Sequence, residues 1–286
     1  MDSFKHHHSL TSIYGGIVTA FFFFCAAAGG FSDAQISTDP YSAWDGSLTP
    51  TALVPFSYIS PFEAEYRFGW QGISAGEAKL QVAARGQDRR SITVRGGPNA
   101  LIRKLWNYEA LYVGESGGNG EVPSWFCMDE SYPKGAVRSE ALFKEGSVTG
   151  RHRKASETKP WEITDLPRIR DLFSAMLFVR SQPLHEGDRL RLTVFPDEAP
   201  YLVDLTVAGR DTITVMEKKI RAIRFTIRIQ TIETHGEHKG RLAPHKKFRS
   251  GRVWISDDDQ RLPLRAEVDI FIGRVFAELV KLNSQP

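Results

Sequence analysis

Cysteine is scarce in this chain, with two residues among 286. Two cysteines form at most one disulfide, so the chain is not a disulfide-stabilised scaffold. An excess of charge is also lacking, because 37 Lys and Arg oppose 34 Asp and Glu, for a formal net charge of +3. This balance excludes a strongly basic chain that binds nucleic acid through charge alone, and we expect no nucleic-acid partner.

The motifs of several enzyme classes are also absent. The sequence has no GxxxxGK(S/T) phosphate loop, no GxGxxG after a strand pattern and no HExxH zinc motif. We therefore predict no cofactor and no metal. The composition is that of a globular protein, with 41% hydrophobic residues, 18 Phe and 6 Trp to build a core.

A long uncharged run occupies residues 13–30, near the N-terminus. It follows a polar segment containing Lys5 and ends in small residues, which is the layout of a secretory signal. We predict a cleaved signal peptide over residues 1–34, with Gly30 as an alternative cleavage point, and a periplasmic protein. An uncleaved membrane anchor is the competing interpretation, because the run approaches the length of a membrane span. Cys25 follows Phe24 instead of a small residue, which disfavours a lipid attachment site.

The rest of the chain divides into two parts. Residues 35–55 are rich in Ser, Thr, Pro and Gly, which predicts a linker or a loosely held N-terminal arm. Residues 56–283 show no fixed-period repeat and no second change of composition. We therefore predict a single domain over that range.

Alternation of apolar and polar residues dominates this domain. The pattern runs from Phe62 to Trp70 and resumes at 78–84 after a glycine-containing turn, which predicts a hairpin with Phe62, Tyr66, Phe68 and Trp70 facing inward. Further runs cover 189–194, 201–207, 223–229, 264–270 and, less regularly, 274–282. Short strands joined by short turns predict an all-β, mainly antiparallel fold built as a curved sheet, half-barrel or sandwich. The glycines from Gly114 to Gly120 predict a flexible hairpin tip.

One segment has apolar residues at three- and four-residue spacing instead. This spacing predicts a helix at about 167–181, capped by Asp165 and ended by Pro183 and Gly187. An apolar stripe needs a partner, and we expect the helix to pack on a face of the sheet.

Three segments resemble the DUF3108 family, exported bacterial proteins of unknown function, in both order and spacing. They are Tyr66-x3-Trp70-x-Gly72-Ile73-x-Ala75-Gly76, then Asp171-x2-Ser174-Ala175-x4-Arg180, and Trp254-Ile255-Ser256-Asp257-Asp258-x2-Arg261-Leu262-Pro263. The resemblance covers about residues 60–282. It implies an envelope location and an antiparallel β architecture, and it carries no catalytic assignment.

The candidate site residues have structural alternatives. Asp171 and Arg180 lie nine positions apart, on nearly opposite faces of a helix, so we expect each to contact a different part of the sheet or a loop. The acidic run Ser256–Asp259 contains oxygen ligands, but a turn between strands is the favoured interpretation. The basic loop 235–249 contains three histidines, and a solvated loop is favoured over a zinc site. Cys127 lies in an apolar segment and predicts a buried thiol instead of a nucleophile.

Three functions follow, in order of preference. The first is a non-enzymatic envelope protein that binds an amphiphilic or apolar ligand such as an envelope lipid, glycolipid or glycan. The second is a scaffold without a small ligand. The third is a hydrolase or lyase acting on cell-wall or surface polysaccharide, with tryptophan platforms and paired carboxylates among Asp257, Asp258, Glu63 and Glu65. The candidate ligand or cleft residues are Tyr66, Trp70, Asp171, Arg180, Trp254, Asp257 and Asp258.

Overall fold

The computed structural model describes residues 42–50, 60–86, 89–105, 107–117, 122–196, 199–245 and 247–283. The predicted signal peptide lies outside the described residues. No helix in the described part of the chain has the length and apolar character needed to cross a membrane.

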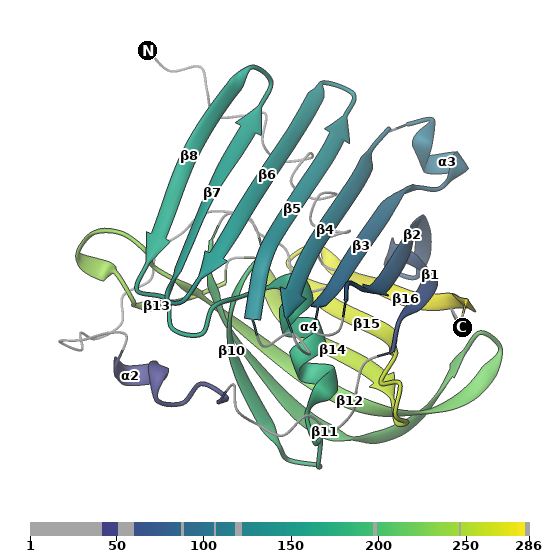
Figure 1. The fold of residues 1–286 in the computed structure, drawn as a ribbon. Helices are drawn as coiled ribbons and strands as arrows, with labels where there is room; N and C mark the ends of the chain where they lie inside the picture. Colours follow the sequence, from purple (N-terminus) through teal and green to yellow (C-terminus); the bar gives the residue numbers. More distant parts are fainter. Residues whose placement is uncertain are drawn as a thin grey trace.

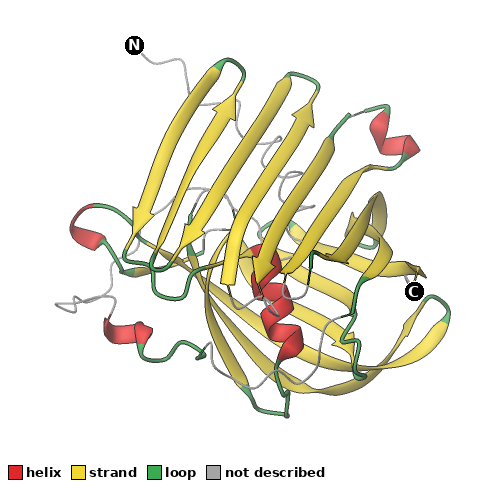
Figure 2. Cartoon of the chain, viewed as in Figure 1, coloured by secondary structure: helices red, strands yellow, loops and turns green. Residues whose placement is uncertain are grey.

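A single curled sheet of 16 strands forms the protein (Figures 1 and 2). The first eight strands are β1 (Phe62–Trp70), β2 (Ile73–Ala84), β3 (Arg89–Pro98), β4 (Glu109–Gly117), β5 (Val122–Tyr132), β6 (Gly135–Lys144), β7 (Ser147–Lys154) and β8 (Glu157–Thr164). The others are β9 (Arg170–Asp171), β10 (Arg189–Phe195), β11 (Tyr201–Val215), β12 (Lys218–Ile232), β13 (Leu242–Pro244), β14 (Phe248–Ser256), β15 (Pro263–Ile270) and β16 (Gly273–Asn283). The predicted all-β, mainly antiparallel class is confirmed.

Most strands that are neighbours in the sequence are also neighbours in the sheet, except that β8 is not paired with β9, nor β13 with β14. The order runs β8 to β1, then β16, β15, β14, β12, β11, β10 and β9, with β13 beside β12. The pairing of β1 with β16 therefore joins the two ends of the domain. Strands β1–β8 form one wall and β10–β16 the other, with helix α4 (Leu172–Ser181) between them (Figure 1).

The core fills the space between the two walls. Phe62, Ala64, Tyr66 and Phe68 of β1 are all buried, as their alternation predicts. Trp70 is different, because it is 41% exposed. Trp70 is the last residue of β1 and lies opposite Ile73, which is 66% exposed, so the core does not extend to this end of the strand and the prediction of an inward Trp70 was wrong.

Helix α4 begins five residues later than predicted. Its N-cap is Asp171, whose Oδ1 accepts hydrogen bonds from the backbone N–H groups of Phe173 (2.7 Å) and Ser174 (3.1 Å). Asp165, the predicted cap, instead lies in a turn with a φ of 63° and forms an ion pair with Lys239. Asp171 supplies a side-chain acceptor at the end of a short strand, so the helix starts there. All ten residues of α4 are buried.

Two other predictions also change. Gly114 lies inside β4 instead of at a hairpin tip, and a Cβ built there would meet the Phe173 ring at 2.6 Å, so the glycine makes room for α4. Part of the predicted linker is packed on the domain, since Trp44 and Leu48 are buried. The Trp44 indole donates to the carbonyl of Gly240 at 3.0 Å, so residues 42–50, which include the short helix α2 (Ser42–Asp45), are not a loose arm.

Candidate functional site

The three segments that carried the family resemblance meet at one buried point between α4 and the two walls. The Tyr66 hydroxyl of β1 donates to the carbonyl of Pro263 at 2.9 Å. Arg180 of α4 donates from Nε to the carbonyl of Arg261 at 2.7 Å and from Nη2 to that of Gln260 at 2.8 Å. Residues far apart in the sequence thus hold the helix, the first strand and the β14–β15 turn together.

Asp258 shapes the turn that Arg180 binds. Its Oδ1 accepts from the Ser256 hydroxyl at 2.6 Å and from the N–H groups of Gln260 and Arg261 at 3.1 Å each. These bonds fold the turn between β14 and β15. Burial lowers the pKa of Arg180 to about 10, with Tyr66 and Asp258 opposing the shift.

Asp257, next along the chain, serves different partners. It lies within 3.2 Å of Arg210 Nε and 3.3 Å of Arg221 Nη2, so two guanidinium groups share its carboxylate. Asp257 and Asp258 are therefore both engaged, one with arginines of β11 and β12 and the other with its own turn. Glu63, another candidate carboxylate, pairs with Lys79 at 2.8 Å, and the hydrogen bond from Lys79 lowers the pKa of Glu63.

The two candidate tryptophans do not share a site with these residues. Trp254 is buried and donates from Nε1 to Asp211 at 3.0 Å. Val253 and Ile255, its neighbours in β14, line the small cavity beside α4, so Trp254 points to the other face of the strand. Trp70 lies at the end of β1, where its Nε1 donates to the carbonyl of Ile272 at 3.2 Å.

The space between α4 and the sheet is nearly filled. The cavity there measures about 50 Å³ and is lined mainly by apolar side chains, together with Tyr66, Arg180 and Arg265. Ligand pockets for small molecules commonly measure about 300–1,000 Å³. In this conformation, α4 therefore occupies the space that an enclosed acyl chain would need.

The side chains considered for a metal site or a reactive thiol have other surroundings in the structure. Among the described residues, no group of three or more His, Cys, Asp or Glu side chains is placed to hold a metal ion. His245 is buried against Tyr201, and its Nδ1 accepts from the N–H of Phe248 at 2.9 Å. Cys127 is buried, and burial raises the pKa of its thiol to about 11, which keeps the thiol protonated near neutral pH.

Asp171 allows a pH test of its capping role. Burial raises the pKa of this carboxyl above its ordinary value, so the folded protein binds the proton more tightly than the unfolded chain. The stability that this group contributes is therefore greatest at acid pH and decreases as pH rises through the raised pKa. Asp171→Asn keeps the cap acceptor without titrating, so we expect its stability relative to the parent to increase from pH 4 to 7.

Urea unfolding of both proteins across that pH range measures this effect. Asp171→Ala, which removes the acceptor and also does not titrate, should be about 1–2 kcal/mol less stable than Asp171→Asn at every pH. A parent protein that gains stability over Asp171→Asn as pH rises would contradict the assignment.

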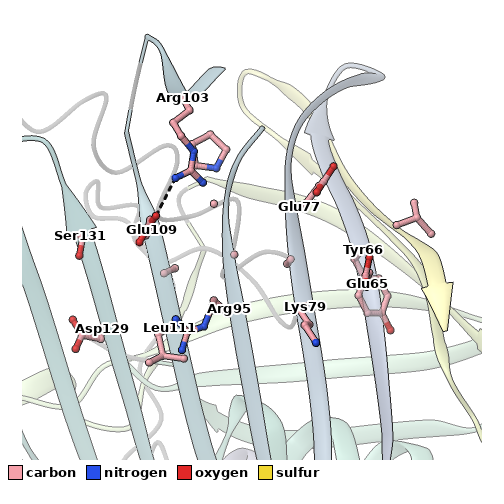
Figure 3. Close-up of a pocket in the computed structure, with 16 residues that line it drawn as sticks. Glu65, Tyr66, Glu77, Lys79, Arg95, Arg103, Glu109, Leu111, Asp129 and Ser131 are labelled. Carbon is pink, nitrogen blue, oxygen red and sulfur yellow. Dashed lines mark hydrogen bonds and ion pairs between the residues drawn. The ribbon is translucent and has the colours of Figure 1, made fainter. Parts of the chain in front are cut away.

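A larger open groove lies on the opposite face of the first wall (Figure 3). It measures about 650 Å³. A row of paired residues crosses five strands there, with outward side chains from β1, β2, β3, β4 and β5: Glu65, Lys79, Arg95, Leu111 and Asp129. Small residues in the same strands, among them Ala78, Gly96 and Gly97, also line it.

The groove carries charges of both signs. Glu65, Glu77, Glu109 and Asp129 supply carboxylates, and Lys79, Arg95 and Arg103 supply cations. Three carboxylates are paired: Glu109 with Arg103 (3.0 Å), Glu65 with Lys281 (3.1 Å) and Asp129 with Arg138 (3.1 Å). Arg95 and Glu77 are exposed and have no charged or hydrogen-bonded partner among the described residues.

Of the sequence-predicted candidates, Tyr66 and the carboxylate Glu65 line this groove. The others are divided among the α4 anchor, the β14–β15 turn and two strand ends or faces. The other groove residues were missed because each occupies an ordinary outward position of a strand, and period-two alternation assigns all such positions to solvent. Only the pairing of five strands brings them together.

Comparison with known proteins agrees with this architecture. A family model described as a protein of unknown function (DUF3108) matches residues 62–280. Among solved structures, a β-barrel-like protein of the DUF1849 domain from Brucella abortus has a TM-score of 0.55 at 11% identity, covering 80% of this chain and 100% of its own. At this identity the likeness concerns the fold alone.

Two other solved structures have lower TM-scores. One is a "putative exported protein" with a YmcC-like fold from Bacteroides fragilis, with a TM-score of 0.35, 6% identity and coverage of 82% of this chain and 100% of its own. The other is a "putative lipoprotein" from Parabacteroides distasonis, with a TM-score of 0.35, 7% identity and coverage of 81% and 99%. Similarities of this size carry no argument about this chain. No curated protein matches its sequence.

Proposed function

Because this chain belongs to the DUF3108 family of proteins of unknown function, we propose that it is a non-enzymatic, exported protein of the cell envelope that binds an amphiphilic ligand. In this proposal the outer groove over β1–β5 holds the polar part of a glycolipid or a related envelope glycan. The location follows from the layout of residues 1–34, which is that of a cleaved secretory signal.

The observation that carries the proposal is the combination of groove size and unpaired polar groups. A volume of about 650 Å³ falls within the range of small-ligand sites. Arg95 offers unused donors and Glu77 unused acceptors beside a set of paired charges. Alternating donors and acceptors suit a ligand rich in hydroxyl groups, whereas a nearly balanced charge does not favour a highly charged one.

Binding suits this groove better than acid–base catalysis. Three of its four carboxylates form ion pairs with cations, and only Glu77 has no charged partner among the described residues. A glycosidase needs two carboxylates that face the scissile bond. The apolar cavity beside α4 is too small for a lipid tail. We therefore expect the outer groove to bind only the polar part of the ligand.

The test measures binding of rough lipopolysaccharide, and of its polysaccharide released by mild acid, to the purified protein. Arg95→Ala should weaken binding about tenfold or more, because a hydrogen bond to a charged group is worth about 1.5–3 kcal/mol. Arg153→Ala is the matched control, since Arg153 is exposed on the same cross-strand row but lies outside the groove.

Isothermal titration calorimetry gives the affinities, and native mass spectrometry identifies any envelope molecule that co-purifies. Equal affinity of Arg95→Ala and the parent would overturn the groove assignment. Failure of both probes to bind, together with a clean protein mass, would favour the scaffold.

A polysaccharide-degrading activity is the second candidate, and one observation favours it. A second open groove of about 690 Å³ over β5–β8 brings Trp125 together with Glu140 and Glu162 on the outer face of the wall. Tryptophan faces can stack on sugar rings, and two carboxylates can share acid–base work. Release of reducing ends from peptidoglycan, abolished by Glu162→Gln, would establish this activity in place of simple binding.

A further inference from the structure

Exposed apolar side chains gather on three turns at one end of the sheet. Of the eight large hydrophobic residues that are exposed in the described part of the chain, five lie there: Trp70, Ile73, Leu101, Leu105 and Phe271. Leu105 is 84% exposed and Ile73 66%. Single exposed apolar residues are common, but a group on adjacent turns marks an interaction surface.

Backbone contacts show that these turns lie side by side. The β1–β2 turn carries Trp70 and Ile73, and the Trp70 indole donates to the carbonyl of Ile272 in the β15–β16 turn at 3.2 Å. The segment with helix α3 (Ala100–Arg103) begins at Asn99, whose N–H donates to Ala75 and whose Nδ2 donates to Ser74, each at 3.0 Å. Helix α3 projects beyond the end of the sheet (Figure 1). We name this group of three turns the apolar tip.

Basic residues flank the apolar tip. Arg103 and Lys104 lie between Leu101 and Leu105, and the exposed ammonium group of Lys104 has no partner among the described residues. The Trp70 indole N–H is already satisfied by a backbone carbonyl, so the exposed part of its ring is apolar. Tryptophan, aliphatic tips and adjacent cations form the combination found where proteins contact the boundary between lipid headgroups and acyl chains.

We propose that the apolar tip docks on the surface of a lipid bilayer that contains anionic phospholipid. The apolar side chains enter the headgroup and acyl boundary, and Arg103 and Lys104 contact lipid phosphates. A projecting group of side chains suits a deformable lipid surface, whereas a rigid protein partner needs a matching pocket. Arg103 also lines the outer groove, so docking would bring the groove to the headgroup layer.

Vesicle co-sedimentation tests the proposal on the purified protein. The probes are vesicles of phosphatidylethanolamine and phosphatidylglycerol at three to one, with phosphatidylcholine vesicles for comparison. Leu101→Ser with Leu105→Ser should lower the partition coefficient at least about tenfold. The matched control is Val122→Ser with Leu142→Ser, which removes apolar residues of 64% and 53% exposure away from the tip.

Charge is tested separately. Lys104→Glu should reduce binding to the anionic vesicles and leave binding to phosphatidylcholine unchanged, whereas Lys144→Glu, an exposed lysine on β6, should change neither. An equal loss in the tip and control double variants would overturn the proposal. So would a concentration-dependent dimer that the tip variant abolishes in analytical ultracentrifugation, since a second copy would then cover the tip. The proposal stands apart from ligand binding in the groove, because Arg95→Ala should leave vesicle binding intact.

Discussion

Replacement of Arg180 by Met should destabilise the protein by about 3 kcal/mol. The variant keeps an apolar side chain of similar length but removes the donors that bind the carbonyls of Gln260 and Arg261. Arg261 is buried, so its carbonyl loses a partner that water does not replace, and an unsatisfied buried acceptor costs about 1–3 kcal/mol. Loss of the second bond, to the partly exposed Gln260, adds to that cost.

Urea unfolding followed by circular dichroism measures the loss, and Arg153→Ala serves as an exposed arginine control expected within about 0.5 kcal/mol of the parent. Arg180→Ala should cost more than Arg180→Met, because it also leaves a cavity beside Phe62 and Met176. Burying a guanidinium carries its own cost, as the lowered pKa of Arg180 shows. If Arg180→Met equals the parent in stability, that cost cancels the two hydrogen bonds and Arg180 does not anchor α4.

Replacement of Glu130 by Ala should have a comparable effect of about 3 kcal/mol. Glu130 is buried in β5, and its carboxylate accepts hydrogen bonds from the hydroxyls of Tyr108, Tyr112 and Tyr132. Tyr108 and Tyr112 are themselves buried, so the substitution removes a charged acceptor from hydroxyls that cannot reach bulk water. Burial raises the pKa of Tyr108 well above its ordinary value, which keeps that hydroxyl protonated as a donor.

Glu130→Gln is the matched variant for this cluster. Its Oε1 still accepts from Tyr108 and Tyr112, and its amide N–H can donate to the hydroxyl of Tyr132, so we expect a loss of about 1 kcal/mol. Denaturant unfolding ranks the three proteins. If both variants lose the same amount, the charge instead of the hydrogen-bond geometry stabilises the cluster, which would contradict this account.

The Glu130 cluster also shows why a buried polar cluster cannot be predicted from the sequence. Tyr112 of β4 and Glu130 and Tyr132 of β5 occupy inward positions, Tyr108 lies just before β4, and nothing in the local pattern marks a glutamate as buried. Its burial depends on three hydroxyls that arrive from a neighbouring strand and from its own strand end. The same holds for Arg180, whose partners lie about 80 residues further along the chain.

The sequence by itself determined the local elements of this protein. Alternation with a period of two predicted β1 at its observed bounds and placed the strands of the second half, because side chains of a strand point to opposite faces whatever lies beside it. Apolar spacing of three and four residues likewise predicted α4, although Asp165 seemed the natural cap on sequence grounds alone. Three motifs were sufficient to identify the family, since their order and spacing are preserved along the chain.

Only the tertiary structure decided how these elements combine. Trp70 lies at the end of β1 beyond the core, the pairing of β1 with β16 joins the two halves of the sheet across some 200 residues, and α4 fills the space where an enclosed ligand was expected. The outer groove and the apolar tip each consist of side chains that are unremarkable in their own strand or turn. Strand register and packing are set by contacts between distant segments, and no local pattern of residues contains that information.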